Sequence, residues 1–282
     1  MATAPINKII EFSNVDGPGN RTSIFVQKCP FKCLYCHNPE TIHMCVHCGV
    51  CVETCPKKGE ALEIINGKVI WHKDKCIDCD TCIHVCPHLS SPKITEMTAD
   101  DVIEQLKPLF PYIQGITVSG GECTNYPEFL TELFTKVHTY NKTCFLDSNG
   151  AYLYEQMPEL MAVTDAVMLD VKAWNKSWHE KLTGISNENV LRNLKLANLR
   201  GKTSYIVASE KLTEDLAKLG YDTRFVPPMI TENFAEEQNI GPVTDYCLVG
   251  NMQELKNVEL IIEVFIELYR QGSNAKVTFY EG

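Results

Sequence analysis

Three cysteines on one short loop, Cys29, Cys33 and Cys36, are the residues of this 282-residue sequence that most directly suggest chemistry. Thiolates at this spacing favour an iron–sulfur cluster. A [4Fe–4S] cubane held by only three cysteines keeps one iron with an open coordination position, which a small molecule can occupy. A zinc knuckle is the alternative, and only His37 lies close enough in the sequence to supply its fourth ligand.

A second group of cysteines forms an internal repeat. Cys45, Cys48, Cys51 and Cys55 recur 31 positions later as Cys76, Cys79, Cys82 and Cys86, and each run ends in a Cys-Pro pair. The spacing is that of bacterial ferredoxins with two clusters, in which the fourth cysteine of each run ligates the other cluster. This crossing predicts one ligand set of Cys45, Cys48, Cys51 and Cys86, and a second of Cys76, Cys79, Cys82 and Cys55. Zinc binding by the same cysteines is the alternative.

The composition limits where this protein works and what it binds. The sequence has 14 cysteines and a formal net charge of -10. It lacks a run of 18 apolar residues, and residues 1–15 lack the apolar stretch of a secretory signal. We therefore expect a cytoplasmic protein with reduced thiols, and neither nucleic acid nor membrane as a partner. The isolated Cys123, Cys144 and Cys247 are expected to be small buried residues.

Outside the repeat, short β-rich runs alternate with amphipathic helices, which is typical of a parallel sheet built from βα units. The capping pattern of Thr98 and Asp101 predicts the start of one helix, and Pro127 predicts the start of another. Six such strands favour an open, partial (β/α)6 barrel over a closed eight-stranded one. We expect strands at 23–27, 116–119, 143–147, 166–171, 204–208, 222–226 and 276–280, and helices at 98–109, 127–138, 186–199, 211–219 and 252–270.

The chain is predicted to consist of a barrel interrupted by one insert. Residues 41–95 contain the whole cysteine repeat and carry six acidic and six basic side chains, so the net negative charge lies elsewhere. We expect residues 1–40 to form the first part of the barrel and residues 41–95 to form a ferredoxin-like insert. Residues 96–282 then complete the barrel and add a C-terminal helix and strand.

Several polar and glycine residues follow the predicted strands directly. In a parallel sheet, the segments after the strands meet at the edge formed by the carboxyl ends of the strands, where ligands bind. We therefore expect these segments to share one site. They are Cys29, Gly120-Gly121-Glu122, Asp147-Ser148-Asn149-Gly150 and Asp170-Val171-Lys172.

The cysteine loop, with the aromatic Tyr35 before its last cysteine, resembles the radical S-adenosylmethionine superfamily. Residues 15–21, Val-Asp-Gly-Pro-Gly-Asn-Arg, and residues 36–40, Cys-His-Asn-Pro-Glu, resemble the activating enzymes of glycyl-radical enzymes. The ferredoxin-type insert is similar to that of the YjjW-type branch. The resemblance covers about residues 7–200.

The resemblance implies a binding site for S-adenosylmethionine beside a [4Fe–4S] cluster on the three-cysteine loop. Gly120, Gly121 and Glu122 would hold the amino group of its methionine part, and Lys172 would pair with the carboxylate. Tyr35, Cys36, His37 and Val171 are implied as further contacts. A monovalent cation site is implied at Asp147, Ser148, Met168 and Asp170. With the two clusters of the insert, the total is three [4Fe–4S] clusters.

The implied reaction is reductive cleavage of S-adenosylmethionine to methionine and a 5'-deoxyadenosyl radical, which removes a hydrogen atom from a glycine of a partner enzyme. A low-potential donor such as flavodoxin or ferredoxin would supply the electron. The turn at Asp16, Gly17, Pro18, Gly19 and Arg21 is expected to lie beside the active site and to dock the partner, because it distinguishes the activating enzymes from other members of the superfamily.

Two features separate this chain from the family pattern. Relatives carry an arginine in the fifth strand and a histidine at the end of the sixth, whereas here Met229 stands near the histidine position and Arg224 lies in the sixth strand. The adenosine end of the pocket therefore departs from the family pattern. Two other functions also stay open. One is a radical enzyme that acts on a small molecule or RNA, and the other is an iron–sulfur electron carrier.

Overall fold

The computed structural model describes residues 2–173, 175–199, 205–207, 223–225, 245–249 and 276–280. The chain divides into two compact units. The first comprises Met1–Lys32 and Asn38–Val226, and the second comprises Cys33–His37 and Pro227–Gly282. Among the described residues, no helix has both the length and the apolar character that crossing a membrane requires.

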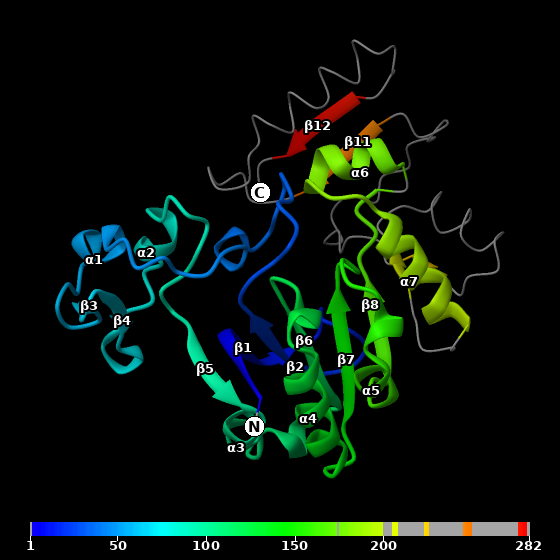
Figure 1. Ribbon diagram of the computed structural model, residues 1–282, viewed down its shortest axis with the longest axis horizontal. Coiled ribbons are helices and arrows are strands. Elements are labelled where there is room, and N and C mark those ends of the chain that lie inside the picture. Colours follow the sequence, from blue (N-terminus) through cyan, green and yellow to red (C-terminus); the bar gives the residue numbers. More distant parts are fainter. Residues whose placement is uncertain are drawn as a thin grey trace. The chain divides into compact units, whose positions relative to one another are not determined.

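A mixed sheet of six strands forms the centre of the first unit (Figure 1), with the order β5-β1-β2-β6-β7-β8. Strands β2, β6, β7 and β8 run parallel to one another, whereas β1 is antiparallel to both of its neighbours, β2 and β5. The strands are β1 (Thr3–Ser13), β2 (Arg21–Val26), β5 (Thr95–Thr98), β6 (Gly115–Gly120), β7 (Thr143–Ser148) and β8 (Ala166–Leu169).

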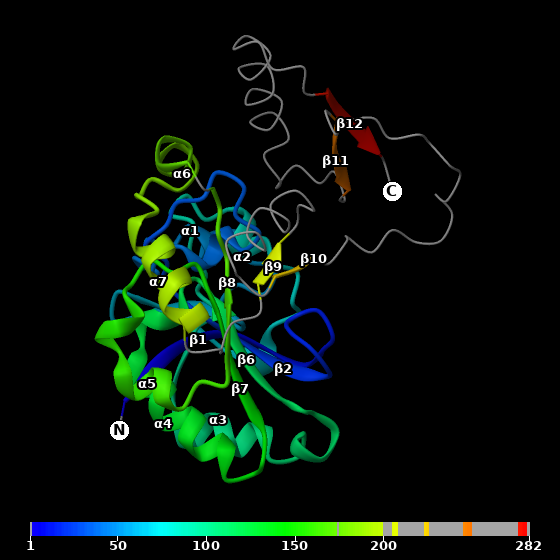
Figure 2. The same cartoon turned by 90° about the vertical axis from the view of Figure 1, so that its right-hand side faces the viewer.

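Helices cover one side of this sheet, where Figure 2 shows α4, α5 and α7 together. The predicted capping box is present: Asp101 N donates to Thr98 Oγ1, and Thr98 N donates to the Asp101 carboxylate. The apolar side of α4 is fully buried. The helices of this part of the chain are α3 (Ala99–Leu106), α4 (Pro127–His138), α5 (Pro158–Ala162), α6 (Lys176–Thr183) and α7 (Glu188–Leu199), with 3-10 turns η3 (Phe110–Tyr112), η4 (Cys123–Asn125) and η5 (Tyr154–Gln156).

The segment with the cysteine repeat folds around a small core of its own, which contains Cys51, Val52, Leu62, Val69 and Cys82. Its hairpin turns at Asn66-Gly67, and both residues have positive φ, as a tight two-residue hairpin turn requires. The chain enters and leaves this segment at adjacent points, because His43 N donates to Leu89 O at 3.1 Å. Its elements are η1 (Pro39–Thr41), α1 (Val50–Thr54), β3 (Leu62–Ile65), β4 (Lys68–Trp71), η2 (Lys73–Lys75) and α2 (Thr81–His84).

Four short strands complete the described elements. In the first unit, β9 (Tyr205–Val207) pairs in parallel with β10 (Thr223–Phe225). In the second unit, β11 (Asp245–Val249) pairs in parallel with β12 (Lys276–Tyr280). The helices predicted at 211–219 and 252–270 lie outside the described residues.

The structure confirms an α/β fold and corrects the arrangement of its strands. The strands predicted at 23–27, 116–119, 143–147, 166–171, 204–208, 222–226 and 276–280 are all present. They do not form one parallel sheet of six strands within the described part of the chain: four belong to the mixed sheet, and β9 and β10 pair separately. The sheet also contains β1 and β5, which the sequence analysis missed. The division at residues 40 and 95 stays a prediction.

Candidate active site

The carboxyl ends of the parallel strands bring most of the predicted site residues of the first unit to one edge of the sheet. The register pairs Val26 with Gly120, and Ser148 with Leu169, so the segments that follow these strands emerge side by side. They contain Cys29, Gly120–Glu122, Asp147–Ser148 and Asp170–Lys172. The remaining residues of the cysteine loop, Cys33, Tyr35, Cys36 and His37, belong to the second unit, where Cys36 N donates to Cys33 O at 3.2 Å.

Backbone hydrogen bonds fix the position of Cys29 after β2. Lys28 N donates to Thr41 O at 2.8 Å, and Cys29 N donates to Ile42 O at 2.9 Å. Lys28 has a φ of 77°, an uncommon conformation for a residue with a side chain. The chain therefore turns sharply before Cys29 and is held there by the strand end on one side and, on the other, by Thr41 and Ile42, which precede the cysteine repeat.

The two glycines after β6 are needed because other backbone segments lie against them. A Cβ at Gly120 would lie 2.3 Å from Val26 O, and a Cβ at Gly121 would lie 2.3 Å from Lys28 O. Neither position can accept a side chain without moving the segment that carries Cys29. In this structure the glycines thus allow the β2 and β6 ends to approach each other.

Glu122 lies at the centre of a buried hydrogen-bond network and is 1 % exposed. Its Oε1 accepts from Thr124 N, Thr124 Oγ1 and Ser148 Oγ, and its Oε2 accepts from the Asn149 backbone nitrogen at 2.7 Å. Donors from η4 and from the end of β7 therefore satisfy both oxygens. The carboxylate therefore joins η4, which follows β6, to the end of β7. Thr124 and Asn149, which make these contacts, were not assigned a role from the sequence.

Three charged side chains gather at the ends of β7 and β8. Asp147 Oδ2 accepts from Ser119 Oγ at 2.6 Å, and Lys172 forms an ion pair with Asp170. Burial, together with the nearby negative charges of Asp170 and Glu122, raises the pKa of Asp147 to about 6, against the opposing effects of Ser119 and Lys172. Val171 is half-buried between the paired residues. A cluster richer in carboxylates than in cations favours a bound cation.

The cysteine repeat lines two small cavities that are partly open to solvent. The cysteines that line the first cavity are Cys45, Cys48, Cys51 and Cys86. Those that line the second are Cys55, Cys76, Cys79 and Cys82. The fourth cysteine of each run therefore lies with the first three of the other run, which is the grouping that the ferredoxin spacing predicts.

The donor chemistry of these cavities fits iron–sulfur clusters. The eight cysteines of the repeat are free thiols. Burial raises the pKa of Cys51 to about 11 and that of Cys82 to about 12, and neighbouring cysteines contribute in the same direction. A cationic cluster core compensates such crowding of thiolates. Lys93 lines the second cavity and binds Asp78 and Asp80 at 3.1 and 2.8 Å, a contact that the sequence had not indicated.

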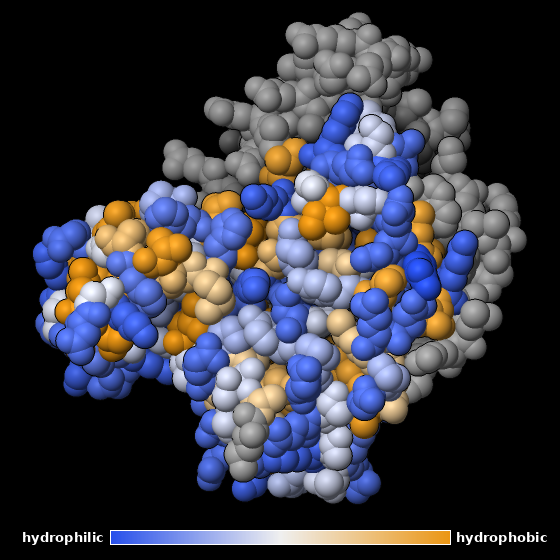
Figure 3. Space-filling model, in the orientation of Figure 1, coloured by the Kyte–Doolittle hydropathy of each residue, from blue (hydrophilic) through white to orange (hydrophobic). Residues whose placement is uncertain are grey.

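Apolar side chains are exposed around both cavities. Figure 3 shows them in orange at the left of the view, over the segment that contains α1 and α2. Cys48 and Cys79 are themselves exposed, so a cluster held in either cavity would have one corner near solvent. The exposed apolar residues of this segment are Met44, Val46, Val50, Ile64, Ile65, Ile77 and Leu89.

The turn that contains Asp16, Gly17, Pro18 and Gly19 lies at the opposite end of the strands from Cys29. It directly precedes Arg21, the first residue of β2, and Thr117 Oγ1 donates to Asp16 O at 2.6 Å. Asp16 also accepts from Ser13 and Ser23, each at 2.5 Å. The expectation that this turn lies beside Cys29 was therefore wrong, because the turn is joined to the amino end of β2 and Cys29 follows its carboxyl end.

Arg21 is buried rather than presented to a partner. It is 1 % exposed, and its guanidinium donates to Thr117, Ile116 and Thr143 and stacks over the Phe145 ring at 3.6 Å. Burial lowers its pKa to about 10, which leaves it charged at neutral pH. These contacts correct the expected docking role of Arg21, since its donors are already bonded to the amino ends of β6 and β7.

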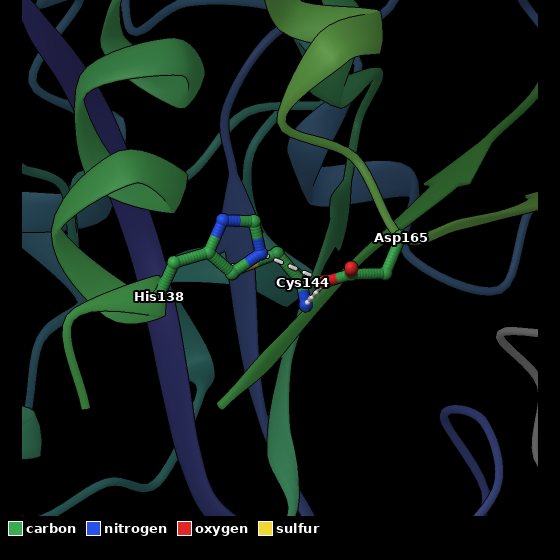
Figure 4. A group of neighbouring side chains, drawn as sticks. All are labelled: His138, Cys144 and Asp165. Atoms are coloured by element: carbon green, nitrogen blue, oxygen red, sulfur yellow. Dashed lines mark hydrogen bonds and ion pairs between the residues drawn. The ribbon is translucent and has the colours of Figure 1, made fainter. Parts of the chain in front are cut away.

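A separate group of metal-binding residue types lies near the start of β7. Figure 4 shows His138, Cys144 and Asp165, with the Asp165 carboxylate shared between the His138 imidazole at 2.8 Å and the backbone nitrogen of Cys144 at 2.7 Å. The Cys144 thiol is fully buried, and burial raises its pKa. This group is explained as a contact that joins α4 to the sheet. Cys123 and Cys144 are buried as predicted, and the side chain of Cys247 lies outside the described residues.

Residues 23–219 match the model of the Radical SAM superfamily. The match covers more than half of the sequence, so the chain belongs to this superfamily. Its relatives there are activating enzymes of glycyl-radical enzymes, as the cysteine loop and the Asp-Gly-Pro-Gly turn had predicted.

One relative, the pyruvate formate-lyase-activating enzyme of Streptococcus mutans, is 33% identical over 232 residues, which are 77% of this chain and 71% of that protein. A Haemophilus influenzae protein described as a glycyl-radical enzyme activating enzyme is 33% identical over 168 residues, 60% of this chain. The match spans about half of that protein, 47% of its length. Among solved structures, QueE from Escherichia coli has a TM-score of 0.44 at 15% identity and covers 99% of this chain and 95% of its own.

Proposed function

We propose that this chain activates a glycyl-radical enzyme by forming a radical from S-adenosylmethionine and transferring it to a glycine of the partner. The observation that carries this proposal is the edge of the sheet at which Cys29, Gly120–Glu122 and Asp170–Lys172 follow neighbouring parallel strands. The family match and the names of the relatives support the same reaction.

We infer that Cys29, Cys33 and Cys36 hold the cluster that serves this reaction. A [4Fe–4S] cluster with one open iron, when bound, supplies the electron that cleaves S-adenosylmethionine. Lys172 is proposed to pair with the carboxylate of the methionine part, for which it would exchange its present partner Asp170. The backbone of Gly120 and Gly121 is proposed to bind the amino group. Tyr35, His37 and Val171 are proposed to complete the contacts.

A monovalent cation is proposed to bind at Asp147, Ser148, Met168 and Asp170. The pKa of Asp147 is raised by burial and by neighbouring carboxylates, so ionisation of this group leaves negative charge with incomplete compensation. A small cation at this point would supply the missing charge and would hold the ends of β7 and β8 together.

The two cavities of the cysteine repeat are proposed to hold two further [4Fe–4S] clusters, which makes three per chain. The grouping of Cys86 with Cys45, and of Cys55 with Cys76, supports this count. We propose that these clusters accept electrons from a low-potential donor such as flavodoxin or ferredoxin. The eight free thiols of the repeat support a reducing cytoplasmic location.

The partner is proposed to meet the turn of Asp16, Gly17, Pro18 and Gly19, because Pro18 and Gly19 are exposed. Both glycines have positive φ, which keeps the turn in one conformation that few other residues adopt. Arg21 then contributes by holding the adjacent strand end.

The activity is tested by anaerobic incubation of the reconstituted protein with candidate glycyl-radical enzymes, a reductant and S-adenosylmethionine. Electron paramagnetic resonance should detect a glycyl radical on one candidate, together with 5'-deoxyadenosine in solution. A protein that forms 5'-deoxyadenosine with a small molecule or an RNA, and no glycyl radical with any candidate, would contradict the proposal.

A further inference from the structure

Asn149 connects the end of β7 with the first cysteine of the cluster loop. Its side-chain nitrogen Nδ2 donates to Cys29 Sγ at 3.4 Å, and its side-chain oxygen Oδ1 accepts from Ala151 N at 3.0 Å. The residue is 9 % exposed, so water competes little for these bonds. Asn149 thus gives Cys29 a hydrogen bond from outside the cysteine loop.

The orientation of this amide is determined by its second contact. A backbone N–H can only donate, so the Asn149 atom that faces Ala151 N must be the oxygen. The nitrogen of the same planar group must then face the sulfur, which excludes the flipped amide. The polar hydrogen of Asn149 is therefore directed at Cys29 Sγ.

Both partners of this bond are held in place by the backbone. Asn149 N donates to Glu122 Oε2 at 2.7 Å, and the other oxygen of Glu122 is held by Thr124 and Ser148. Cys29 N donates to Ile42 O at 2.9 Å. Neither Asn149 nor Cys29 can swing away without breaking buried hydrogen bonds, so the N–H···S contact is a fixed part of the site.

We propose that Asn149 raises the reduction potential of the cluster that Cys29 binds, and that it does so as a positioning residue through this hydrogen bond. The proposal rests on the proposed function, which assigns Cys29 as a ligand. Reduction adds one electron from a low-potential one-electron donor to the cluster, with no proton taken up and no covalent bond changed. A positive N–H dipole at the sulfur stabilises the more negative, reduced cluster.

The consequence is a defined role for Glu122 as well. Its buried carboxylate holds the Asn149 backbone, and Asn149 in turn holds its amide at the sulfur. Glu122 therefore influences the cluster indirectly, by holding Asn149, which donates to Cys29. This role is separate from the proposed contact of the Gly-Gly-Glu segment with S-adenosylmethionine. Reduction of the cluster and the shape of the binding site are linked by one network.

The test is a redox titration of the full chain with its clusters, followed by electron paramagnetic resonance. The signal of this cluster is the one that disappears when Cys29, Cys33 and Cys36 are all replaced by Ala. Asn149→Asp keeps the size of the side chain but loses the donor, and Asn149→Ala removes the side chain. A hydrogen bond to a charged sulfur is worth about tenfold in the equilibrium, so Asn149→Ala should shift the midpoint by about 59 mV to more negative values. Asn149→Asp should shift it further in the same direction, because its carboxylate also adds negative charge beside the cluster.

Asn125→Ala is the matched control, because Asn125 also joins these loops, by donating to Lys28 O and Glu122 O, without contacting a sulfur. It should leave the midpoint unchanged. An unchanged midpoint in Asn149→Ala, or an equal shift in Asn125→Ala, would overturn the inference and leave the proposed function intact. A signal that survives replacement of the three cysteines would instead overturn the ligand assignment, and the inference with it.

Discussion

Lys172 is the side chain whose proposed role depends most on a change of partner. It is 22% exposed and forms an ion pair with Asp170, so it is neither fully solvated nor deeply buried. Binding of an anionic group requires Lys172 to share its charge between Asp170 and the ligand. A residue at the surface of the same segment would not need such an exchange.

Lys172→Ala is expected to weaken binding of S-adenosylmethionine by about 10-fold to 100-fold. The reason is that the carboxylate of the bound S-adenosylmethionine would lose its cation, a contact worth about 1.5 to 3 kcal/mol. Lys172→Arg should lose less, since it keeps the charge. Isothermal titration calorimetry on the reconstituted protein measures the difference. Binding of equal strength in the wild type and Lys172→Ala would assign Lys172 to the ion pair with Asp170 alone.

Asp147 gives the stability of the protein a dependence on pH. Its pKa is raised from the ordinary 3.8 to about 6, so at mildly acidic pH the folded protein keeps a proton that the unfolded chain has released. The free energy of unfolding should therefore decrease as the pH rises from about 5 to about 7.5, by about 1 kcal/mol from this group. The Asp147→Asn variant should lack this contribution.

The comparison is made by urea unfolding of both proteins across that pH range in buffers without alkali ions. Other carboxylates titrate in both proteins, so the difference between the two isolates Asp147. Two parallel stability curves would show that Asp147 ionises at its ordinary pKa. Added potassium should stabilise the wild type more than Asp147→Asn at about pH 7.5, if the cation site is assigned correctly.

At the scale of elements, Arg21 ties three strands together at their amino ends. Its bonds reach Thr117 of β6 and Thr143 of β7, and Phe145 covers its guanidinium. Arg21→Met should lower the free energy of unfolding by about 2 to 4 kcal/mol, because several buried hydrogen bonds are lost at once. Arg21→Lys should recover only part of this, since an ammonium group cannot reproduce the fork of donors.

Chemical denaturation measures this effect, and S-adenosylmethionine cleavage without a partner serves as the control for the active site. If Arg21→Met unfolded at the wild-type denaturant concentration and lost only glycyl-radical formation, a direct role in docking would be restored to Arg21. The structure favours a loss of stability in Arg21→Met, because the Arg21 side chain cannot reach the surface without breaking its hydrogen bonds.

The strands that follow local rules were predicted, and the two strands of the sheet that depend on distant partners, β1 and β5, were missed. β6 and β7 are short apolar runs between turn residues, which the sequence displays directly. The pairing of β1 shifts register between Ile6 and Lys8 and again between Ile10 and Ser13, so its side chains do not alternate regularly. The outer partner of β1, Thr95–Thr98, lies beyond the whole cysteine repeat.

The site was predictable to the extent that its residues follow strands or carry a metal-binding spacing. The grouping of Cys55 with the second run followed from spacing alone. The burial of Arg21 did not, because its acceptors Thr117 and Thr143 are far away in the sequence and charged residues are mostly exposed. The contact of Asn149 with Cys29 joins residues 120 positions apart and also has no local signal.

At the scale of the whole molecule, the assignment of three clusters predicts about 12 irons per chain after anaerobic reconstitution. Replacement of Cys29, Cys33 and Cys36 by Ala should reduce this to about eight and abolish cleavage of S-adenosylmethionine, because the cysteines of the repeat lie in separate cavities. Iron and sulfide analysis measures the count. About four irons in the wild type, or zinc in stoichiometric amounts, would contradict the assignment.

The bond between His43 N and Leu89 O has a consequence for how such a chain can be rebuilt. Because the cysteine-repeat segment leaves the fold and returns to it at neighbouring points, its removal would create a gap that a few residues can bridge. The segment can therefore be exchanged as a cassette, by genetic engineering or by recombination between genes, while Lys28 and Cys29 keep their contacts with Thr41 and Ile42. Proteins with and without this segment would then share the same active-site fold and differ in whether they carry the two further clusters proposed to accept electrons.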